Sequence, residues 1–163
     1  MTTRVYCMYG LGGALWSYGI ENVLARAIRK LPDTYVPATR GYTQWREIVD
    51  DIKRNKRPGD KIVVVGHSMG AASATYVTDY VPVDLVVLYD LAGQAPSKLG
   101  KNTGRAIDIY DTAPDMVPEW RVQAVKGHEK KIERWTSAFG HTGQDDSIQL
   151  ASKVVEEIKK LAA

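Results

Sequence analysis

Short β-branched runs alternate along the chain with longer segments in which apolar residues recur every three or four positions. This alternation is typical of parallel βαβ units, so it predicts an α/β fold: a three-layer α/β/α sandwich with a mostly parallel sheet of about six strands. The strands are expected at residues 4–9, 35–38, 61–66, 83–89, 105–110 and 121–126. The runs IVVV and LVVL are the most apolar, as expected of central strands covered on both faces.

Four helices are expected between and after these strands. They span residues 14–31, ended by Pro32, residues 43–56, a segment from Ser68 to before Pro82, and residues 145–161, which should close one face of the sheet. Residues 91–104 and 111–119 are rich in Gly, Pro and polar residues and indicate loops. The last two strands are therefore expected to have short connections, and an antiparallel orientation of these strands remains an alternative.

Composition narrows the class of protein. With 163 residues, 44% hydrophobic and 25% charged, the chain is expected to form a single globular domain over residues 1–163. The net charge of +3 includes the run KRNKR at residues 53–57, which indicates a solvated helix end rather than a nucleic-acid site. The single cysteine, Cys7, is expected in a buried strand. No leader or membrane span is evident, so we expect a soluble, cytoplasmic protein, with secretion after leader removal left open.

The segment KIVVVGHSMGAAS places Ser68 between a strong strand pattern and a helix of small residues. A nucleophile on a strand-to-helix turn needs small flanking residues, because the sharp turn brings neighbouring backbone close. The same position puts the serine at a helix N-terminus, where amide groups stabilise developing negative charge. The alternative is a glycine-rich turn with no chemical role.

The segment MYGLGGAL follows the first strand, so the backbone N–H groups of Leu11 and Met69 are expected to form an oxyanion hole. The alternative is a turn that only permits tight packing. The segment lacks the third glycine of a dinucleotide-binding loop, and the sequence has no GKS or GKT of a phosphate loop, so neither type of nucleotide site is expected. The acyl-transfer mechanism predicted below needs neither a metal nor an organic cofactor.

Three histidines compete for the role of general base. His67 is expected to pack beneath the sheet, and His128 lies in the charged turn KGHEKK. His141 is the preferred base because it lies in the loop GHTG ahead of the last helix.

The segments YGLGG, GHSMG and FGHTGQDD, in this order, resemble the α/β-hydrolase superfamily, specifically its small lipase-like and esterase-like members. The chain is short for that superfamily, so the usual lid is expected to be absent. The resemblance implies a triad of serine, acid and histidine in that order.

Asp90 is the preferred acid, because it ends the strand VDLVVLYD at the same edge of the sheet as Ser68, and LYDLAG looks like the acid-bearing turn of lipases. Many members of the superfamily carry the acid one strand later, where Asp111 and Asp115 are the alternatives.

These residues predict a serine hydrolase that cleaves a small-molecule or acyl-bearing carboxylic ester through an acyl-enzyme. A thioesterase or amidase would use the same groups, and an inactive binding module stays possible. Trp16, Tyr18, Tyr42 and Trp45 are candidates for the rim of an open site.

Overall fold

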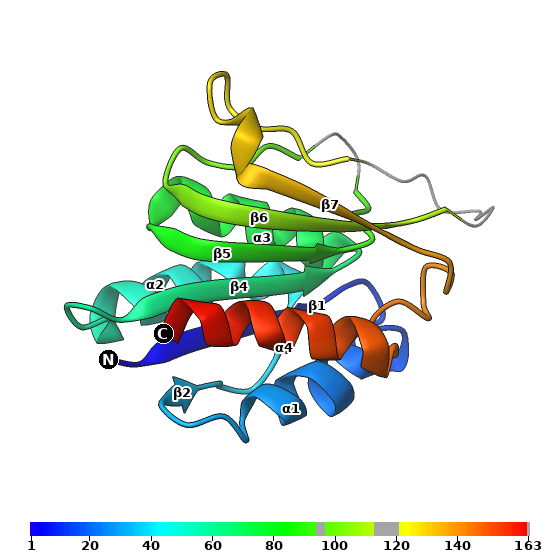
Figure 1. Cartoon of the computed structure of the whole chain (residues 1–163), viewed down its shortest axis with the longest axis horizontal. Coiled ribbons are helices and arrows are strands. Elements are labelled where there is room, and N and C mark those ends of the chain that lie inside the picture. Colours follow the sequence, from blue (N-terminus) through cyan, green and yellow to red (C-terminus); the bar gives the residue numbers. More distant parts are fainter. Residues whose placement is uncertain (94–96, 113–120, 163) are drawn as a thin grey trace.

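A seven-stranded sheet forms the centre of the molecule in the computed structural model, which describes residues 1–93, 97–112 and 121–162 (Figure 1). Its strand order is β2-β1-β4-β5-β6-β7, with β3 also paired to β1, and each of these pairings is parallel. The strands are β1 (Thr3–Tyr9), β2 (Thr34–Tyr35), β3 (Arg40–Gly41), β4 (Lys61–His67), β5 (Val83–Tyr89), β6 (Thr103–Asp111) and β7 (Ile132–Ser137). The predicted three-layer α/β sandwich is confirmed.

Helices cover both faces of this sheet (Figure 1). The helices are η1 (Gly13–Leu15), η2 (Ile20–Ala25), α1 (Arg26–Ile28), η3 (Tyr42–Gln44), α2 (Trp45–Asn55), α3 (Met69–Tyr80), η4 (Glu129–Lys131) and α4 (Ile148–Ala162). Helices α2 and α3 lie on one face, and η2, α1 and α4 lie on the other. As predicted, the last helix closes one face.

Alternate residues of each central strand enter opposite cores, because successive side chains of a strand point to opposite faces. In β4, Ile62 and Val64 pack toward α2 and α3, whereas Val63 and Val65 pack toward α4 and η2. Cys7 lies in the second core, and burial raises the pKa of its thiol to about 12. This double burial explains why β4 and β5 have nearly continuous apolar sequences.

The strand expected at residues 35–38 is wrong as a single element. Two short pairings replace it: Thr34–Tyr35 with the start of β1, and Arg40–Gly41 with its end. Pro37 lies between them, and proline has no N–H to donate to a ladder. The first helix is also interrupted, as the 3-10 turn η1, the π-helix η2 and the short α1, although Ile20, Leu24 and Ile28 are buried on one face as expected.

The strand expected at residues 121–126 is also wrong. Gln123 instead forms an isolated bridge with Lys98, and the true edge strand is β7, which is parallel to β6. The antiparallel alternative is therefore wrong as well. Strand β7 starts at Ile132, eleven residues after the start of the expected strand at residue 121. The chain from Asp111 to Ile132 is therefore long enough for a parallel crossover.

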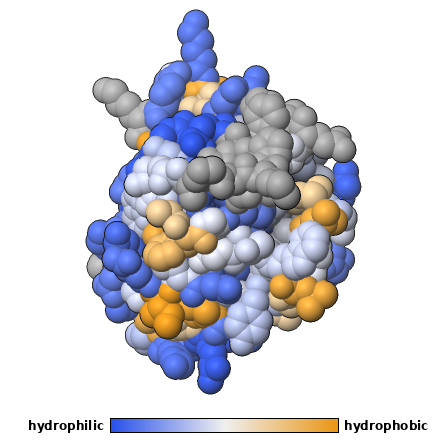
Figure 2. All heavy atoms as spheres, turned by 90° about the vertical axis from the view of Figure 1, so that its right-hand side faces the viewer, coloured by the Kyte–Doolittle hydropathy of each residue, from blue (hydrophilic) through white to orange (hydrophobic). Residues whose placement is uncertain are grey.

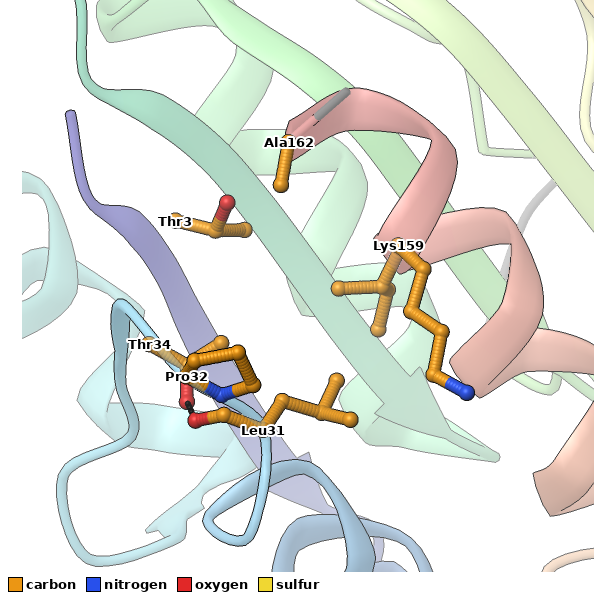
Figure 3. Close-up of a pocket in the computed structure, with 7 residues that line it drawn as sticks. Thr3, Leu31, Pro32, Thr34, Lys159 and Ala162 are labelled. Atoms are coloured by element: carbon orange, nitrogen blue, oxygen red, sulfur yellow. Dashed lines mark hydrogen bonds between the residues drawn. The ribbon is translucent and has the colours of Figure 1, made fainter.

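All of the strands end at the same edge of the sheet because they are parallel. Ser68, Asp90 and Leu11 follow β4, β5 and β1 at this carboxyl edge. Thr3 and Ala162, near the two chain ends, line a hollow of about 300 Å³ at the opposite edge (Figure 3). Leu31 and Pro32 form its other wall, and none of the residues that line it is a serine, cysteine, histidine or carboxylic acid. The chemistry-bearing residues therefore gather away from this hollow.

Candidate active site

Ser68 occupies a strained turn between β4 and α3. Its φ of 56° and ψ of −121° lie outside the regions that side chains other than glycine usually adopt. The Ser68 N–H donates to the carbonyl of Tyr89 at 2.9 Å, and the Ser68 carbonyl accepts from Ala71 at 3.0 Å. These bonds tie the turn to β5 and to the first turn of α3, so the strain is held in place by the surrounding structure.

Glycines on both sides of Ser68 permit the close approach that this turn requires. A Cβ atom on Gly66 would lie 2.2 Å from the carbonyl oxygen of Gly70, and one on Gly70 would lie 2.7 Å from the carbonyl oxygens of Met8 and Tyr9. Both separations are far below van der Waals contact. Steric crowding alone therefore requires glycine at both ends of GHSMG, whether or not Ser68 is a nucleophile.

His141 lies between Ser68 and Asp90 and is in hydrogen-bond contact with both. The Nε2 atom of His141 is 2.9 Å from the Ser68 Oγ atom, and its Nδ1 atom contacts the Asp90 carboxylate. A carboxylate only accepts, so Nδ1 carries the proton and donates it to Asp90. Nε2 is then the acceptor for the Ser68 hydroxyl, which is the arrangement a general base needs.

The three side chains differ in their access to water. Asp90 is 1% exposed and follows β5 with a φ of 45°, a conformation that turns its carboxylate toward the histidine loop. The Ser68 residue is 8% exposed, and the His141 side chain is 14% exposed. A buried acid behind a partly open histidine and serine leaves one side of the site open to a substrate.

The other sequence candidates lie elsewhere. His128 lies before η4 and β7, so it is at the opposite edge of the sheet from Ser68. Asp111 is buried at the end of β6, paired in register with Ser137, and the Nδ1 atom of His141 contacts Asp90 instead. Asp115 lies outside the described residues.

The two residues whose N–H groups are expected in the oxyanion hole belong to segments next to Ser68. Met69 is the first residue of α3, and Leu11 follows β1 in the loop of residues 10–18, which we call the oxyanion loop. Neither N–H has a hydrogen-bond acceptor among residues 1–93, 97–112 and 121–162. A Cβ atom on Gly10 would lie 2.9 Å from the Ser68 Cβ atom, so this loop lies directly against the serine. Both donors are available to a bound oxygen.

A pocket of about 470 Å³ opens beside the first turns of α3. We call it the α3 pocket; it is lined by Tyr42, Thr43, Trp45, Arg46, Met69, Ala72, Ser73, Tyr76, Ala92 and Gly93. Met69 and Ala92 connect it to the site, because Met69 follows Ser68 and the Ala92 N–H donates to the Ser68 carbonyl at 3.3 Å. Tyr42 and Trp45 are thus next to the site as expected, whereas Trp16 and Tyr18 are exposed on the oxyanion loop.

Three buried polar residues beside the triad escaped the sequence analysis or were given no role in it. Ser17 contacts His67, and Asp145 accepts a hydrogen bond from the Ile20 N–H at 3.1 Å. Burial lowers the pKa of His67 to about 4 and raises the pKa of Asp145 to about 7, with the neighbouring Asp146 adding to the latter. These contacts join segments that are distant in the sequence, so no local pattern could have indicated them.

Two further observations concern membrane spans and metal sites in the described part of the chain. Within the described ranges, none of the helices combines the length and the apolar character that crossing a bilayer requires. In the same ranges, no three His, Cys, Asp or Glu side chains are grouped so that they could hold a metal ion.

Comparison with solved structures places this architecture among known folds. SOBER1 of Arabidopsis thaliana superposes with a TM-score of 0.62 at 11% identity, with 100% of both chains covered. ClbQ from the colibactin NRPS/PKS pathway superposes with a TM-score of 0.55 at 12% identity over 99% of both chains. No protein-family model matches the sequence, and no curated protein matches it either. The chain shares its overall fold with these two proteins, and this fold is α/β-hydrolase-like.

Proposed function

We propose that the protein is a serine hydrolase that cleaves carboxylic esters. The observation that carries this proposal is the continuous contact from Asp90 through His141 to Ser68, with Nε2 of the histidine 2.9 Å from the serine oxygen. A serine hydroxyl is a weak nucleophile unless a neighbouring base takes its proton, and this arrangement supplies such a base. The α/β-hydrolase-like fold that the chain shares with SOBER1 and ClbQ is consistent with this class.

In the proposed reaction, His141 takes the proton of Ser68 as Oγ attacks the ester carbonyl. The N–H groups of Leu11 and Met69 bind the oxygen that becomes negative, and Asp90 stabilises the imidazolium. His141 then gives its proton to the departing alcohol, which leaves an acyl group on Ser68. Water deprotonated by His141 attacks this acyl group, and the acid is released with Ser68 restored.

The α3 pocket is the proposed site for one side of the ester. It begins at Met69, whose N–H faces the developing oxyanion in this proposal, and its walls include the rings of Tyr42, Trp45 and Tyr76. The lining also includes polar side chains, among them Thr43, Arg46 and Ser73, which could orient a bound group. A thioester or an amide would present its carbonyl to the same groups. Activity assays with matched ester, thioester and amide substrates therefore distinguish the three classes.

Labelling with a fluorophosphonate probe tests the proposal, because the probe loses fluoride only when an activated serine oxygen attacks its phosphorus. We expect the parent protein to be labelled at Ser68 and to hydrolyse short chromogenic esters, and Ser68→Ala to lose labelling and at least about 10⁴-fold in kcat. Ser152→Ala, at an exposed position of α4, is the matched control and should label like the parent. A parent protein with no labelling and no turnover would instead indicate a binding module.

A further inference from the structure

We propose that His67, the residue before the nucleophile, is a positioning residue that fixes the backbone of His141 and connects it to the oxyanion loop. This inference rests on the proposed function, because it concerns the placement of the proposed general base. It assigns a role to a buried histidine that the three-residue triad does not use.

Two short hydrogen bonds hold the His67 ring between separate segments. Its Nε2 atom is 2.7 Å from the backbone carbonyl oxygen of His141, and its Nδ1 atom is 2.7 Å from the Ser17 Oγ atom. Ser17 Oγ in turn accepts the N–H of Gly10 at 3.1 Å. One ring thus contacts both the loop that carries the proposed base and the loop that carries Leu11.

The direction of each bond follows from the chemistry of the partners. A carbonyl oxygen only accepts, so the Nε2 atom of His67 carries the proton. In a neutral ring Nδ1 is then an acceptor, and the Ser17 hydroxyl donates to it while its oxygen accepts from Gly10. The chain of donors runs from Gly10 through Ser17 and His67 to the carbonyl of His141. Each N–H or O–H donor in this chain has one acceptor.

The ring is buried, and this favours its neutral form. His67 is 1% exposed, and burial lowers its pKa to about 4, as does the nearby His141, while the hydrogen bond to the His141 carbonyl and the charge of Asp90 act in the opposite direction. The ring centroids of His67 and His141 are 5.0 Å apart. A charged His67 would therefore oppose the imidazolium that His141 becomes, whereas a neutral ring supports it.

The histidine loop needs such an anchor because it lies between β7 and α4 in turns. Gly140 has a φ of +74°, and the Gly143 N–H closes a local turn onto its carbonyl at 3.1 Å. Asp145 holds the far end of the loop through the Ile20 N–H, and its other oxygen lies 4.0 Å from Nε2 of His67. The bond from His67 acts at His141 itself, where a small displacement would change the distance to Ser68 most directly.

Substitutions that keep or remove the N–H donor test this role. His67→Gln keeps an amide N–H that can reach the His141 carbonyl, whereas His67→Phe keeps a ring of similar size and has no donor. We expect His67→Phe to lower kcat by roughly 10- to 100-fold with KM within about twofold, because misplacing a catalytic group acts on the chemical step. His67→Gln should recover most of this loss. His128→Gln, in a half-buried turn at the opposite edge, is the control and should match the parent.

Ser17→Ala provides a milder second variant that keeps His67. It removes both hydrogen bonds of the Ser17 hydroxyl, the one to His67 and the one from the Gly10 N–H, at the far end of the chain of donors, so kcat should fall roughly fivefold. All variants are compared at a temperature well below their thermal unfolding midpoints, so that a change in stability alone does not enter the rates.

Proton NMR supplies a readout that simple packing would not move. The Nδ1 proton of His141, shared with Asp90, should give a strongly downfield resonance in the parent and in His67→Gln, and this resonance should be lost or broadened in His67→Phe. An unchanged kcat and an unchanged resonance in His67→Phe would overturn the proposal, as would a His67→Gln variant as impaired as His67→Phe. A parent that neither labels nor hydrolyses esters would refute the proposed function, yet the resonance in the parent and its response in His67→Phe would still decide the positioning role.

Discussion

Asp90 and Asp111 end neighbouring strands, and both are buried at the carboxyl edge of the sheet. The sequence alone could not distinguish these two acids, because each comes at the end of an apolar strand segment. In the structure the carboxylate of Asp90 contacts Nδ1 of His141. The two acids therefore give matched variants for testing which of them supports the proposed base.

We expect Asp90→Asn to lower kcat by about 10⁴-fold, because an amide facing Nδ1 favours the wrong histidine tautomer. Asp111→Asn should retain most of the parent activity. The measurement is kcat for a short chromogenic ester in the parent and both variants. A loss in Asp111→Asn as large as that in Asp90→Asn would assign the acid to β6 instead.

Asp145 makes the stability of the protein depend on pH. Burial raises its pKa to about 7 from 3.8, so between about pH 4 and pH 7 the folded state keeps a proton that the unfolded state releases. This contribution to the free energy of unfolding is fully present below pH 4 and is lost as the pH rises to 7, at up to about 1.4 kcal/mol per pH unit. Asp145→Asn removes it.

The check on this prediction is urea denaturation of the parent and of Asp145→Asn from pH 4.5 to 7.5. Asp108, whose pKa burial raises to about 6, and His67 titrate in the same range in both proteins, so they cancel in the difference. The parent should lose stability relative to the variant as the pH rises. Parallel curves would show that Asp145 ionises in the folded state as it does in the unfolded chain.

At the scale of single elements, the turn between β4 and α3 depends on close backbone contacts. A Cβ atom on Gly70 would meet the carbonyl oxygens of Met8 and Tyr9, which belong to β1 and are held by sheet hydrogen bonds. Met8 pairs with Gly66 of β4 and Tyr9 pairs with Gly41 of β3, so a shift of either residue would disturb one of these ladders. Gly41, in contrast, has a φ of −69°, and its nearest contact would be the Gln44 Oε1 atom at 3.5 Å.

We expect Gly70→Ala to lower the free energy of unfolding by about 2–3 kcal/mol, because the new methyl group clashes with fixed backbone. Gly41→Ala should change it by no more than about 0.5 kcal/mol. Chemical denaturation of both variants and the parent measures the difference. Equal stability of the two variants would mean that the first turn of α3 shifts freely away from β1.

The elements that could be predicted from sequence are those whose pattern has one strong physical cause. Strands β4 and β5 are buried on both faces, and α4 has a clear apolar stripe. Each of these sequence patterns therefore fits one type of element and hardly any other. Strand β7 was missed because it is an edge strand with the sequence IERWTS, in which only Ile132 and Trp135 are large and apolar. An edge strand has fewer buried positions, so its signal is weaker.

The proposed site divides in the same way. Ser68 could be predicted because steric and chemical needs fall on five adjacent residues, and His141 because its loop precedes the last helix. The acid could only be narrowed to Asp90, Asp111 and Asp115, since several strands end at the same edge. The contacts of His67 with Ser17 and with the His141 carbonyl depend on three segments that meet only in the folded chain.

On the scale of the whole molecule, the carboxyl edge presents the face on which a substrate would arrive. Figure 2 looks onto this side, where apolar patches alternate with hydrophilic surface. Leu11 and Leu15 of the oxyanion loop, Phe139 of the histidine loop and Ile148 of α4 are all exposed. The α3 pocket opens beside Ser68, between α3 and the residues that precede and begin α2.

Tyr76 and Tyr80 allow the α3 pocket to be tested with matched variants. Both rings pack against Trp45, with centroids 5.8 Å and 5.3 Å away, and both are exposed on α3, but only Tyr76 lines the pocket. We expect Tyr76→Ala to lower kcat/KM for esters with long or aromatic groups roughly fivefold, from a lost contact of about 1 kcal/mol. Tyr80→Ala should not. Kinetics over an ester series decide this, and equal effects of the two variants would place the substrate elsewhere.

The position of the two chain ends has a practical consequence for handling the protein. Because Thr3 and Ala162 line one hollow at the edge away from Ser68, a tether attached near either residue would leave the nucleophile facing outward (Figures 1 and 3). Immobilised on beads or displayed on a particle through one end, the protein should accept even bulky reagents as readily as it does when free in solution.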